Sequence, residues 1–535
     1  MDTTRLKLAV KSAIVTAAGV RRRLRRWSWQ VIPAGLRRPF EAVEHYDVWA
    51  YRSDLTTAVS DLLSTGQVEH FVLSERLLPN PVIAVDAEQR SQVQRLLKTH
   101  PTAATWWLSP HRDGIAGTAR PARRLLPRPM VNASGILVCR NLLTPNGLPL
   151  NDSETGVLIQ FWDRVDAESV STGGGVHAAG TRFAPDNNGV LAYADPQLWR
   201  DAEANAHRLP EAPPHLLLVN EPIDVVYTWV DGDDPAWRRR KAEALGQDLS
   251  NYTSDAAIDA RFESRDELRY SLRSIEMFAN WVNHIWIVTD QQKPSWLRED
   301  DRLTVIDHRD IFTDPSALPV YNSHAIESQL HHIPGLSQRY LYFNDDMLFA
   351  SPAAPEDFFY ANDIHRFFPS PALIDTSEHT EQDIAVTAAA KNNRDFMRAQ
   401  FGRTITNKLR HTPQAQSKPV MERFEAEHPD LIDQVMRSRL RQDTDYSLTS
   451  SLSQYYAFAI KQAVPTAIAN GYVDLASPHA EYLLHLWLRK RDRTVICVND
   501  SGTENERANR FLRQFFVNYY PLPSRWEAVP ASSND

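Results

Sequence analysis

The chain has 535 residues, 42% of them hydrophobic and 24% charged, which excludes a disordered or fibrous protein and predicts roughly two to four globular domains. Its formal net charge of −8 argues against a nucleic-acid-binding protein, which would carry a basic balance. Only two cysteines occur, Cys139 and Cys497. They exclude a disulfide-rich scaffold and a multi-cysteine metal site and favour a cytoplasmic protein, although one long-range disulfide between them stays open.

Residues 1–40 form a basic segment in which a short apolar stretch, interrupted by Lys11, is followed by five arginines between positions 21 and 26. The stretch is too short and too charged to span a bilayer. It predicts either a basic amphipathic helix on an anionic membrane surface, at the inner face of the membrane, or a solvated terminus. Both interpretations stay open.

An N-terminal α/β domain is predicted over residues 41–204. Short apolar runs predict strands at residues 70–75, 81–87, 135–141 and 156–165, and helical spacing predicts a helix at 90–100. The proline-rich residues 205–222 are a predicted linker.

After the linker, strand-like and helix-like segments alternate. Strands are expected at 223–230, 284–290, 303–308 and 339–350, and helices at 264–282 and 322–333. This alternation predicts an α/β fold: a doubly wound, mainly parallel sheet with a helical C-terminal part, over residues 223–520. Helices are expected at 417–440 and 447–464, and residues 521–535 are assigned to a tail.

Two of the predicted strands run directly into acidic residues. "IDVVYTWVDGDDPAW" brings Asp231 and Gly232 to a strand end, where α/β proteins usually bind ligands, but Asp-Gly is also a common turn. In "RYLYFNDDMLFA", Asn344 precedes the pair Asp345 and Asp346, which could hold Mg²⁺ or Mn²⁺ or form a solvated turn.

Several basic residues lie near predicted helix ends. Arg265 and Arg269 flank a helix start that suits a phosphate, or alternatively form intrahelical ion pairs. Glu327 and His331 are four residues apart on one predicted helix, so they are expected to share a face, as a base with its orienter, as two metal ligands, or as a surface ion pair. Their spacing excludes the His-Glu-x-x-His zinc motif.

Three further residues complete the candidate set. His411 lies in a predicted loop and could accept a proton from a hydroxyl group, or simply be exposed. Arg441 and Asp445 precede a predicted helix, and each is a weak signal alone. Together, acids at strand ends with arginines and histidines between them favour electrostatic stabilisation of a phosphorus centre over covalent catalysis.

Four blocks of the chain resemble the Stealth family of sugar-1-phosphate transferases, whose bacterial members make capsule or exopolysaccharide and whose animal relatives are N-acetylglucosamine-1-phosphotransferases. The blocks cover residues 223–237, residues 265–297 with 318–352, residues 411–458, and "CVND" at 497–500. The third block departs from the family pattern at "RLRQDTD", where an aromatic residue, arginine and serine usually precede the acid.

The resemblance implies transfer of a hexose-1-phosphate from a nucleotide-sugar, expected to be a UDP-sugar, to a glycan hydroxyl, with release of a nucleoside monophosphate. It implies that Asp345 and Asp346 hold a divalent metal and the diphosphate beside Asn344. The implied nucleotide, phosphate or sugar contacts are Asp231, Gly232, Arg265 and Arg269. The residues implied at the reacting centre are Glu327, His331, His411, Arg441 and Asp445.

Two alternatives stay open. A conventional metal-dependent glycosyltransferase would use the same sheet and acids but release a nucleoside diphosphate, and fold alone does not separate the two. A non-catalytic scaffold for polysaccharide assembly is the other alternative, and the intact acids and histidines argue against it.

Overall fold

A computed structural model describes residues 41–73, 80–112, 115–117, 119–122, 133–144, 150, 155–167, 169–170, 175–186, 188, 190–209, 215–246, 265–380, 383–500 and 506–528. The predicted basic segment 1–40 and the last seven residues of the predicted tail lie outside these ranges. The chain divides into two compact units, residues 1–215 and 216–535. The division falls inside the predicted linker.

The first unit is an α/β unit built on a nine-stranded mixed sheet. The predicted strands and helix are confirmed as β2 (His70–Leu73), β3 (Val82–Asp86), α3 (Arg90–Thr99), β7 (Gly135–Arg140) and β9 (Val157–Arg164). The prediction missed α2 (Val48–Thr65), α5 (Pro196–Ala204) and β4 (Trp106–Arg112), whose apolar run is interrupted by Pro110 and the basic residues after it.

The second unit is built on a five-stranded sheet in the order β16–β15–β14–β17–β22. Its strands are β14 (Ile223–Thr228), β15 (Ile285–Thr289), β16 (Leu303–Asp307), β17 (Arg339–Asn344) and β22 (Gln414–Ser417). The first four are parallel and β22 is antiparallel to β17. Thr228 and Asn344 are paired in register, so the carboxyl ends of the two central strands meet at one edge.

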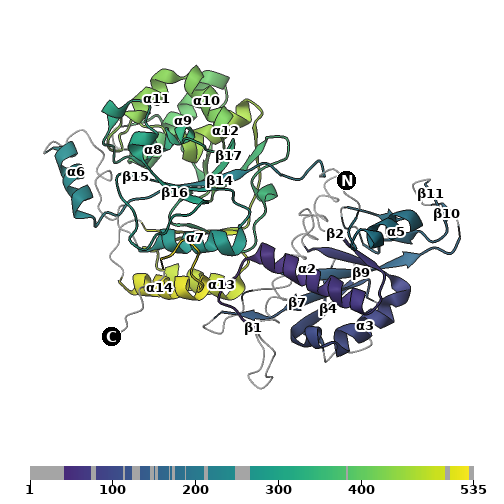
Figure 1. Cartoon of the computed structure of the whole chain (residues 1–535). Helices are drawn as coiled ribbons and strands as arrows, with labels where there is room; N and C mark the ends of the chain where they lie inside the picture. The colour runs from purple at the N-terminus through teal and green to yellow at the C-terminus, as the bar shows by residue number, and fades with distance from the viewer. Residues whose placement is uncertain are drawn as a thin grey trace, which may run out of the picture. The chain divides into compact units, whose positions relative to one another are not determined.

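Helices cover both faces of this sheet. Figure 1 shows α7 (Glu267–Phe278), with α13 (Ala480–Lys490) and α14 (Glu506–Tyr519) beside it, on one side, and α8 (Ser323–Glu327), α10 (Lys418–Glu427) and α11 (Pro429–Met436) on the other. Val226, Val288 and Tyr342 pack with residues of α8 and α11 in one buried cluster. The predicted α/β fold with a doubly wound, mainly parallel sheet is therefore confirmed.

The C-terminal part is largely helical, as predicted, and also carries small sheets. Its further helices are α9 (Ala385–Phe401), the π-helical turn Leu448–Leu452 and α12 (Ser453–Ala459). One small sheet has three strands, β18 (Met347–Phe349), β25 (Val495–Asn499) and β24 (Asn470–Asp474). Two others have two strands each, β19 (His365–Phe367) with β23 (Ala463–Pro465) and β20 (Pro369–Leu373) with β21 (Asn407–Leu409). The helical segment predicted at 417–440 is confirmed, but it consists of two helices, α10 and α11. It breaks at His428 because Pro429 has no N–H to continue the ladder.

The predicted helix at 322–333 is also interrupted. The helix α8 ends at Glu327, and a separate 3₁₀ turn, η8, spans Leu330–His332. The Ser328 hydroxyl donates to the Ala325 carbonyl at 2.8 Å, a local bond that competes with the helical ladder. Glu327 and His331 therefore do not share a helix face, and that prediction is wrong.

The structure also bears on the C-terminal residues, the two cysteines and the question of a membrane-spanning helix. Residues 521–528 are packed, since Trp526 is fully buried. Cys139 and Cys497 are both buried and are not joined by a disulfide, so the bridge left open is not formed. In the parts of the chain that the structure describes, no helix has the length and apolar character needed to cross a bilayer.

Asp224 ties the central strand to its neighbours. This fully buried carboxylate of β14 accepts hydrogen bonds from Asn283 Nδ2 at 2.8 Å and Trp286 Nε1 at 3.0 Å. It also accepts bonds from the backbone N–H and the hydroxyl of Ser337, each at 2.9 Å. One carboxylate thus joins β14 to β15 and to the chain that enters β17.

We expect Asp224→Ala to lower the free energy of unfolding of the second unit by at least about 3 kcal/mol, because each buried donor that loses its acceptor costs about 1–3 kcal/mol. Denaturant unfolding would measure the change. The matched control is Asp301→Ala, an exposed acid, which should stay within about 0.5 kcal/mol of the wild type. Equal stability of the two variants would contradict the role of Asp224.

Candidate active site

Three carboxylates meet at the carboxyl edge of the parallel sheet. Asp345 and Asp346 form the turn between β17 and β18, and Glu267 opens α7. Burial, together with repulsion from a neighbouring acid, raises the pKa of Asp345 to about 7 and that of Glu267 to about 8. Burial also raises the pKa of Asp346 to about 6, with Glu267 adding to the rise. The cluster disfavours full ionisation unless a positive charge compensates it.

The two oxygens of Asp346 differ in their contacts. The Cys497 thiol donates to Oδ2 at 3.1 Å, whereas Oδ1 is buried and has no hydrogen-bond partner in the described part of the chain. An orphaned carboxylate oxygen beside two more acids is a donor set suited to Mg²⁺ or Mn²⁺. Among the described residues, these acids do not form a group of three donor atoms within 4.8 Å of one another. Two carboxylates are a common protein contribution to a Mg²⁺ shell, which water and phosphate oxygens complete.

Tyr472 and His411 form a wall beside the acids. Tyr472 is paired in register with Cys497, and its ring lies 5.0 Å from that of His411. Burial raises the pKa of the Tyr472 phenol to about 12, with added effects of Cys497, Asp474 and Asp346. The Tyr472 side chain is 41% exposed, and His411 is also exposed to solvent. The structure thus brings His411 to the same side of the site as the acids.

A chain of polar contacts follows Asn344 at the strand ends. The Tyr342 hydroxyl donates to Asn344 Oδ1 at 2.9 Å and lies 3.0 Å from the Thr228 hydroxyl. Glu327 is 3% exposed, and the Ser450 hydroxyl donates a hydrogen bond to its carboxylate. The nearby Glu327 charge contributes to a strongly raised Tyr342 pKa, after burial as the main cause. Glu327 therefore lies next to the end of β17.

Asp445 is a buried hub rather than an exposed ligand. At 2% exposure it accepts hydrogen bonds from Asn322 at 2.7 Å, from Ser438 at 2.6 Å and from the backbone N–H of Gln442 at 3.0 Å. These bonds hold the loop that carries Arg441, whose guanidinium donates to the Ser323 hydroxyl at 3.0 Å. Asp445 thus positions Arg441 at the start of α8.

The remaining predicted contacts are distributed around this edge. Asp231 accepts from the backbone N–H of Asp233 at 2.9 Å, and the Gly232 carbonyl accepts from Arg238. Arg265 pairs with Asp500 at 2.7 Å, and Arg269 pairs with Glu527 at 2.6 Å.

His331 contacts α10. Its side chain is 0% exposed, and Nε2 is 2.8 Å from the carboxylate of Glu425 on α10. His332 contacts the same carboxylate at 3.0 Å. These contacts join the 3₁₀ turn to α10.

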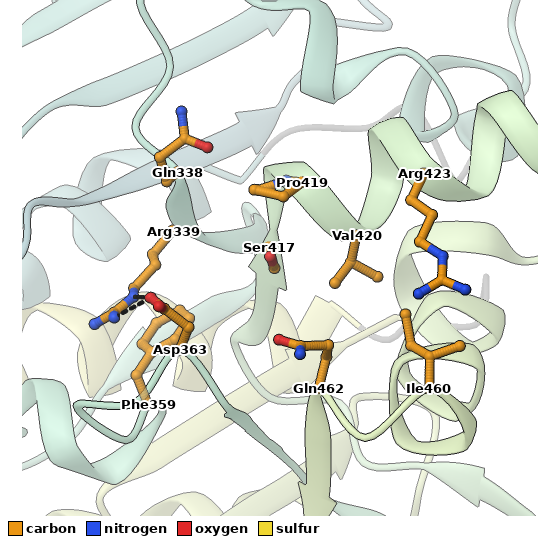
Figure 2. Close-up of a pocket in the computed structure, with 10 residues that line it drawn as sticks. All are labelled: Gln338, Arg339, Phe359, Asp363, Ser417, Pro419, Val420, Arg423, Ile460 and Gln462. Carbon is orange, nitrogen blue, oxygen red and sulfur yellow. Dashed lines mark hydrogen bonds and ion pairs between the residues drawn. The ribbon is translucent and has the colours of Figure 1, made fainter.

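A cavity of about 330 Å³ lies at the opposite, amino end of β17. Figure 2 shows Arg339 and Asp363 paired on one side of it, with Val420 and Ile460 on the other. The cavity lining contains none of the predicted site residues. The acids, rather than this cavity, therefore mark the candidate active site.

Family models for the four conserved regions of Stealth proteins match the chain. Region 1 matches residues 221–248, region 2 residues 261–367, region 3 residues 410–458 and region 4 residues 487–535. The exopolysaccharide phosphotransferase SCO6021 of Streptomyces coelicolor is 36% identical over 519 residues, which cover 90% of this chain and 93% of that protein. The chain belongs to the Stealth family.

Other relatives match mainly the second unit. The exopolysaccharide phosphotransferase SCO6023 of S. coelicolor is 47% identical over 332 residues, which cover 61% of this chain and 55% of that protein. The exopolysaccharide phosphotransferase CpsY of Mycobacterium tuberculosis H37Rv is 39% identical over 323 residues, which cover 59% of this chain and 60% of that protein. The match thus spans little more than half the length of these two relatives.

Solved structures are more distant. A galactosyltransferase LgtC in complex with donor and acceptor sugar analogues matches with a TM-score of 0.28 and 11% identity, over 58% of this chain and 98% of that protein. Similarity at this level supports no conclusion about function. The predicted Stealth membership is confirmed by the family models and by relatives that are named exopolysaccharide phosphotransferases.

Two members of the site are absent from the predicted set. Glu267 is 6% exposed and adds to the acid cluster, although its place at a predicted helix start between two arginines suggests only ion pairs. Tyr472 carries no motif, and its position depends on the register of β24 with β25. The four-residue spacing of Glu327 and His331 was misleading because the helix between them is broken.

The raised pKa values predict a pH-dependent effect of Mg²⁺ on stability. Acids whose pKa is higher in the folded state lose stability as the pH rises from their ordinary values near 4 toward 6–8. A bound cation should offset this loss. We expect Mg²⁺ to raise the melting temperature by a few degrees at pH 8 and by less at pH 5.5, relative to chelator.

Differential scanning fluorimetry would measure this difference. Asp346→Asn should reduce the Mg²⁺-dependent rise, whereas Asp430→Asn, at an exposed position on α11, should leave it unchanged. An equal Mg²⁺ effect in both variants would contradict the assignment of the cation to the acid cluster.

Proposed function

We propose that this Stealth protein is an exopolysaccharide phosphotransferase that moves a hexose-1-phosphate, such as N-acetylglucosamine-1-phosphate, from a UDP-sugar to a glycan hydroxyl and releases a nucleoside monophosphate. The observation that carries the proposal is the orphaned Asp346 oxygen within an acid cluster at the sheet edge, in a chain that aligns almost end to end with a relative of that name. The basic residues 1–40 are a candidate contact with an anionic membrane at the cytoplasmic face.

Asp345 and Asp346, supported by Glu267, would hold the divalent cation, Mg²⁺ or Mn²⁺. When bound, the ion would supply positive charge to the donor diphosphate. Asn344 and the turn at Asp231 and Gly232 lie at the same carboxyl edge as these acids, where the nucleotide would bind. These residues therefore form the donor side of the proposed site.

His411 is the better candidate for the base that accepts the proton of the acceptor hydroxyl. The residue reaches solvent, but partial burial of its ring and the charge of Lys408 lower its pKa. The imidazole is therefore neutral near pH 7. His331 is fully buried and engaged by Glu425, so a glycan hydroxyl has no access to it. We therefore assign the proton transfer to His411.

The other predicted residues would position neighbouring side chains or supply positive charge to the site. Arg441, held by the Asp445 hub, would place positive charge near the end of β17. Glu327 would act through its contacts with Ser450 and Tyr342 as a positioning residue. Arg265 would offer its charge beside the acids from its pair with Asp500, whereas Arg269 is committed to Glu527 at the edge of the site.

The released nucleotide distinguishes the proposal from glycosyl transfer. Attack on the phosphorus attached to the sugar breaks its bond to the nucleoside monophosphate, so UDP-N-acetylglucosamine would yield UMP. Attack on the sugar carbon would yield UDP. Chromatography of a reaction with Mg²⁺ and a cell-envelope glycan should therefore show acceptor-dependent UMP, and acceptor-dependent UDP would contradict the proposal.

Asp346→Asn should lower kcat by at least about 100-fold, since the variant loses charge that would hold the cation and the donor. The fold should persist, because the substitution removes a carboxylate whose pKa is raised by burial and by Glu267. Steady-state kinetics and circular dichroism would test both statements, with Asp430→Asn as the matched control. Near-normal kcat in Asp346→Asn would refute the role of the acid cluster.

His411→Ala should lower kcat by about 10²–10⁴-fold, the usual range for loss of a general base. In the wild type, kcat should fall on the acidic side, below the ordinary histidine pKa, because protonation of His411 removes the base. The variant should lose this acidic limb. His479→Ala, at another exposed histidine, is the control. An unchanged pH profile in His411→Ala would contradict its assignment as the base.

A further inference from the structure

Two imidazoles and one carboxylate form a second cluster. It is carried by elements other than those that carry the acid cluster. His331 and His332 belong to η8, and Glu425 belongs to α10. Nε2 of His331 lies 2.8 Å, and Nε2 of His332 3.0 Å, from the same carboxylate oxygen of Glu425. One donor atom from each residue lies within 4.8 Å of the other two.

The cluster has one buried wall and one accessible side. His331 is 0% exposed, whereas the His332 and Glu425 side chains are 27% and 25% exposed. An ion could therefore enter from solvent and keep water at an open coordination position. Three protein ligands with an open position are the pattern of accessible zinc sites, whereas structural sites are closed by four.

The protonation states match those of metal ligands. Burial lowers the pKa of His331, which favours the neutral imidazole. The hydrogen bonds from His331 and His332 lower the pKa of Glu425 to about 2, so the carboxylate is ionised at neutral pH. Neutral imidazole and ionised carboxylate are the forms that bind metal ions.

We propose that His331, His332 and Glu425 form a binding site for a first-row transition metal ion, with Zn²⁺ the best fit. Imidazole nitrogen suits zinc, whereas Mg²⁺ prefers an all-oxygen shell such as the acid cluster offers. Ligand atoms about 2.0–2.2 Å from a tetrahedral zinc ion lie roughly 3.4 Å apart, so the donors need to separate by about 0.5 Å. The ion would cross-link α10 to the segment that follows Glu327.

The test uses the full chain, stripped of metal with a chelator and then titrated with Zn²⁺ in competition with a chromophoric chelator. One high-affinity site per chain is expected. His332→Ala and Glu425→Gln should each weaken its affinity at least about tenfold. His479→Ala and Asp346→Asn, which alter an exposed histidine and the acid cluster, should bind Zn²⁺ as the wild type does.

Absence of a high-affinity site, or wild-type affinity in both His332→Ala and Glu425→Gln, would overturn the proposal. If either variant fails to fold by circular dichroism, X-ray absorption of the zinc-loaded wild type decides the question. Imidazole scattering in the first shell would support the site, and a shell of oxygens alone would overturn it. These measurements do not depend on the transferase reaction, so their failure leaves the proposed function untouched.

Discussion

The central constraint in this structure is the mutual repulsion of Glu267, Asp345 and Asp346 in a crowded position. Burial and neighbouring charge raise the pKa of all three acids toward neutrality. Such a cluster stabilises nothing by itself, so the scaffold must hold it against its own electrostatics. The parallel pairing of β14 with β17, and the antiparallel pairing of β18 with β25, fix both ends of the turn that carries the two aspartates.

The residues around the acids also hold the scaffold in place. Asp224 joins β14 to its neighbours deep in the sheet, and Asp445 holds the Arg441 loop at the edge. Glu527 holds the arginines of α7, Arg269 and Arg273, and so fixes the helix that starts at Glu267. Buried carboxylates with several hydrogen bonds each thus support a cluster in which, among the described contacts, Asp346 Oδ1 has no hydrogen-bond partner. A buried oxygen without a hydrogen-bond partner is where we expect a ligand to bind.

Much of the fold follows from the sequence because its strands and α7 have strong apolar periodicity. Asp345 and Asp346 were identifiable because an apolar strand ends directly in them. Glu327 and His331 were wrongly placed on one face, since a local Ser328 bond interrupts α8. Tyr472 and Glu425 could not be assigned, because their partners come from strands and helices far along the chain. Spacing in sequence predicts contacts within an element, but not between elements.

The proposed reaction breaks a bond between two phosphate groups rather than the bond at the sugar carbon. The most direct measurement uses UDP-N-acetylglucosamine with radioactive phosphorus at the position attached to the sugar, Mg²⁺ and a glycan acceptor. We predict that the label moves into the glycan and that Asp346→Asn abolishes this transfer. Label that remains in released UDP while the sugar alone enters the glycan would contradict it.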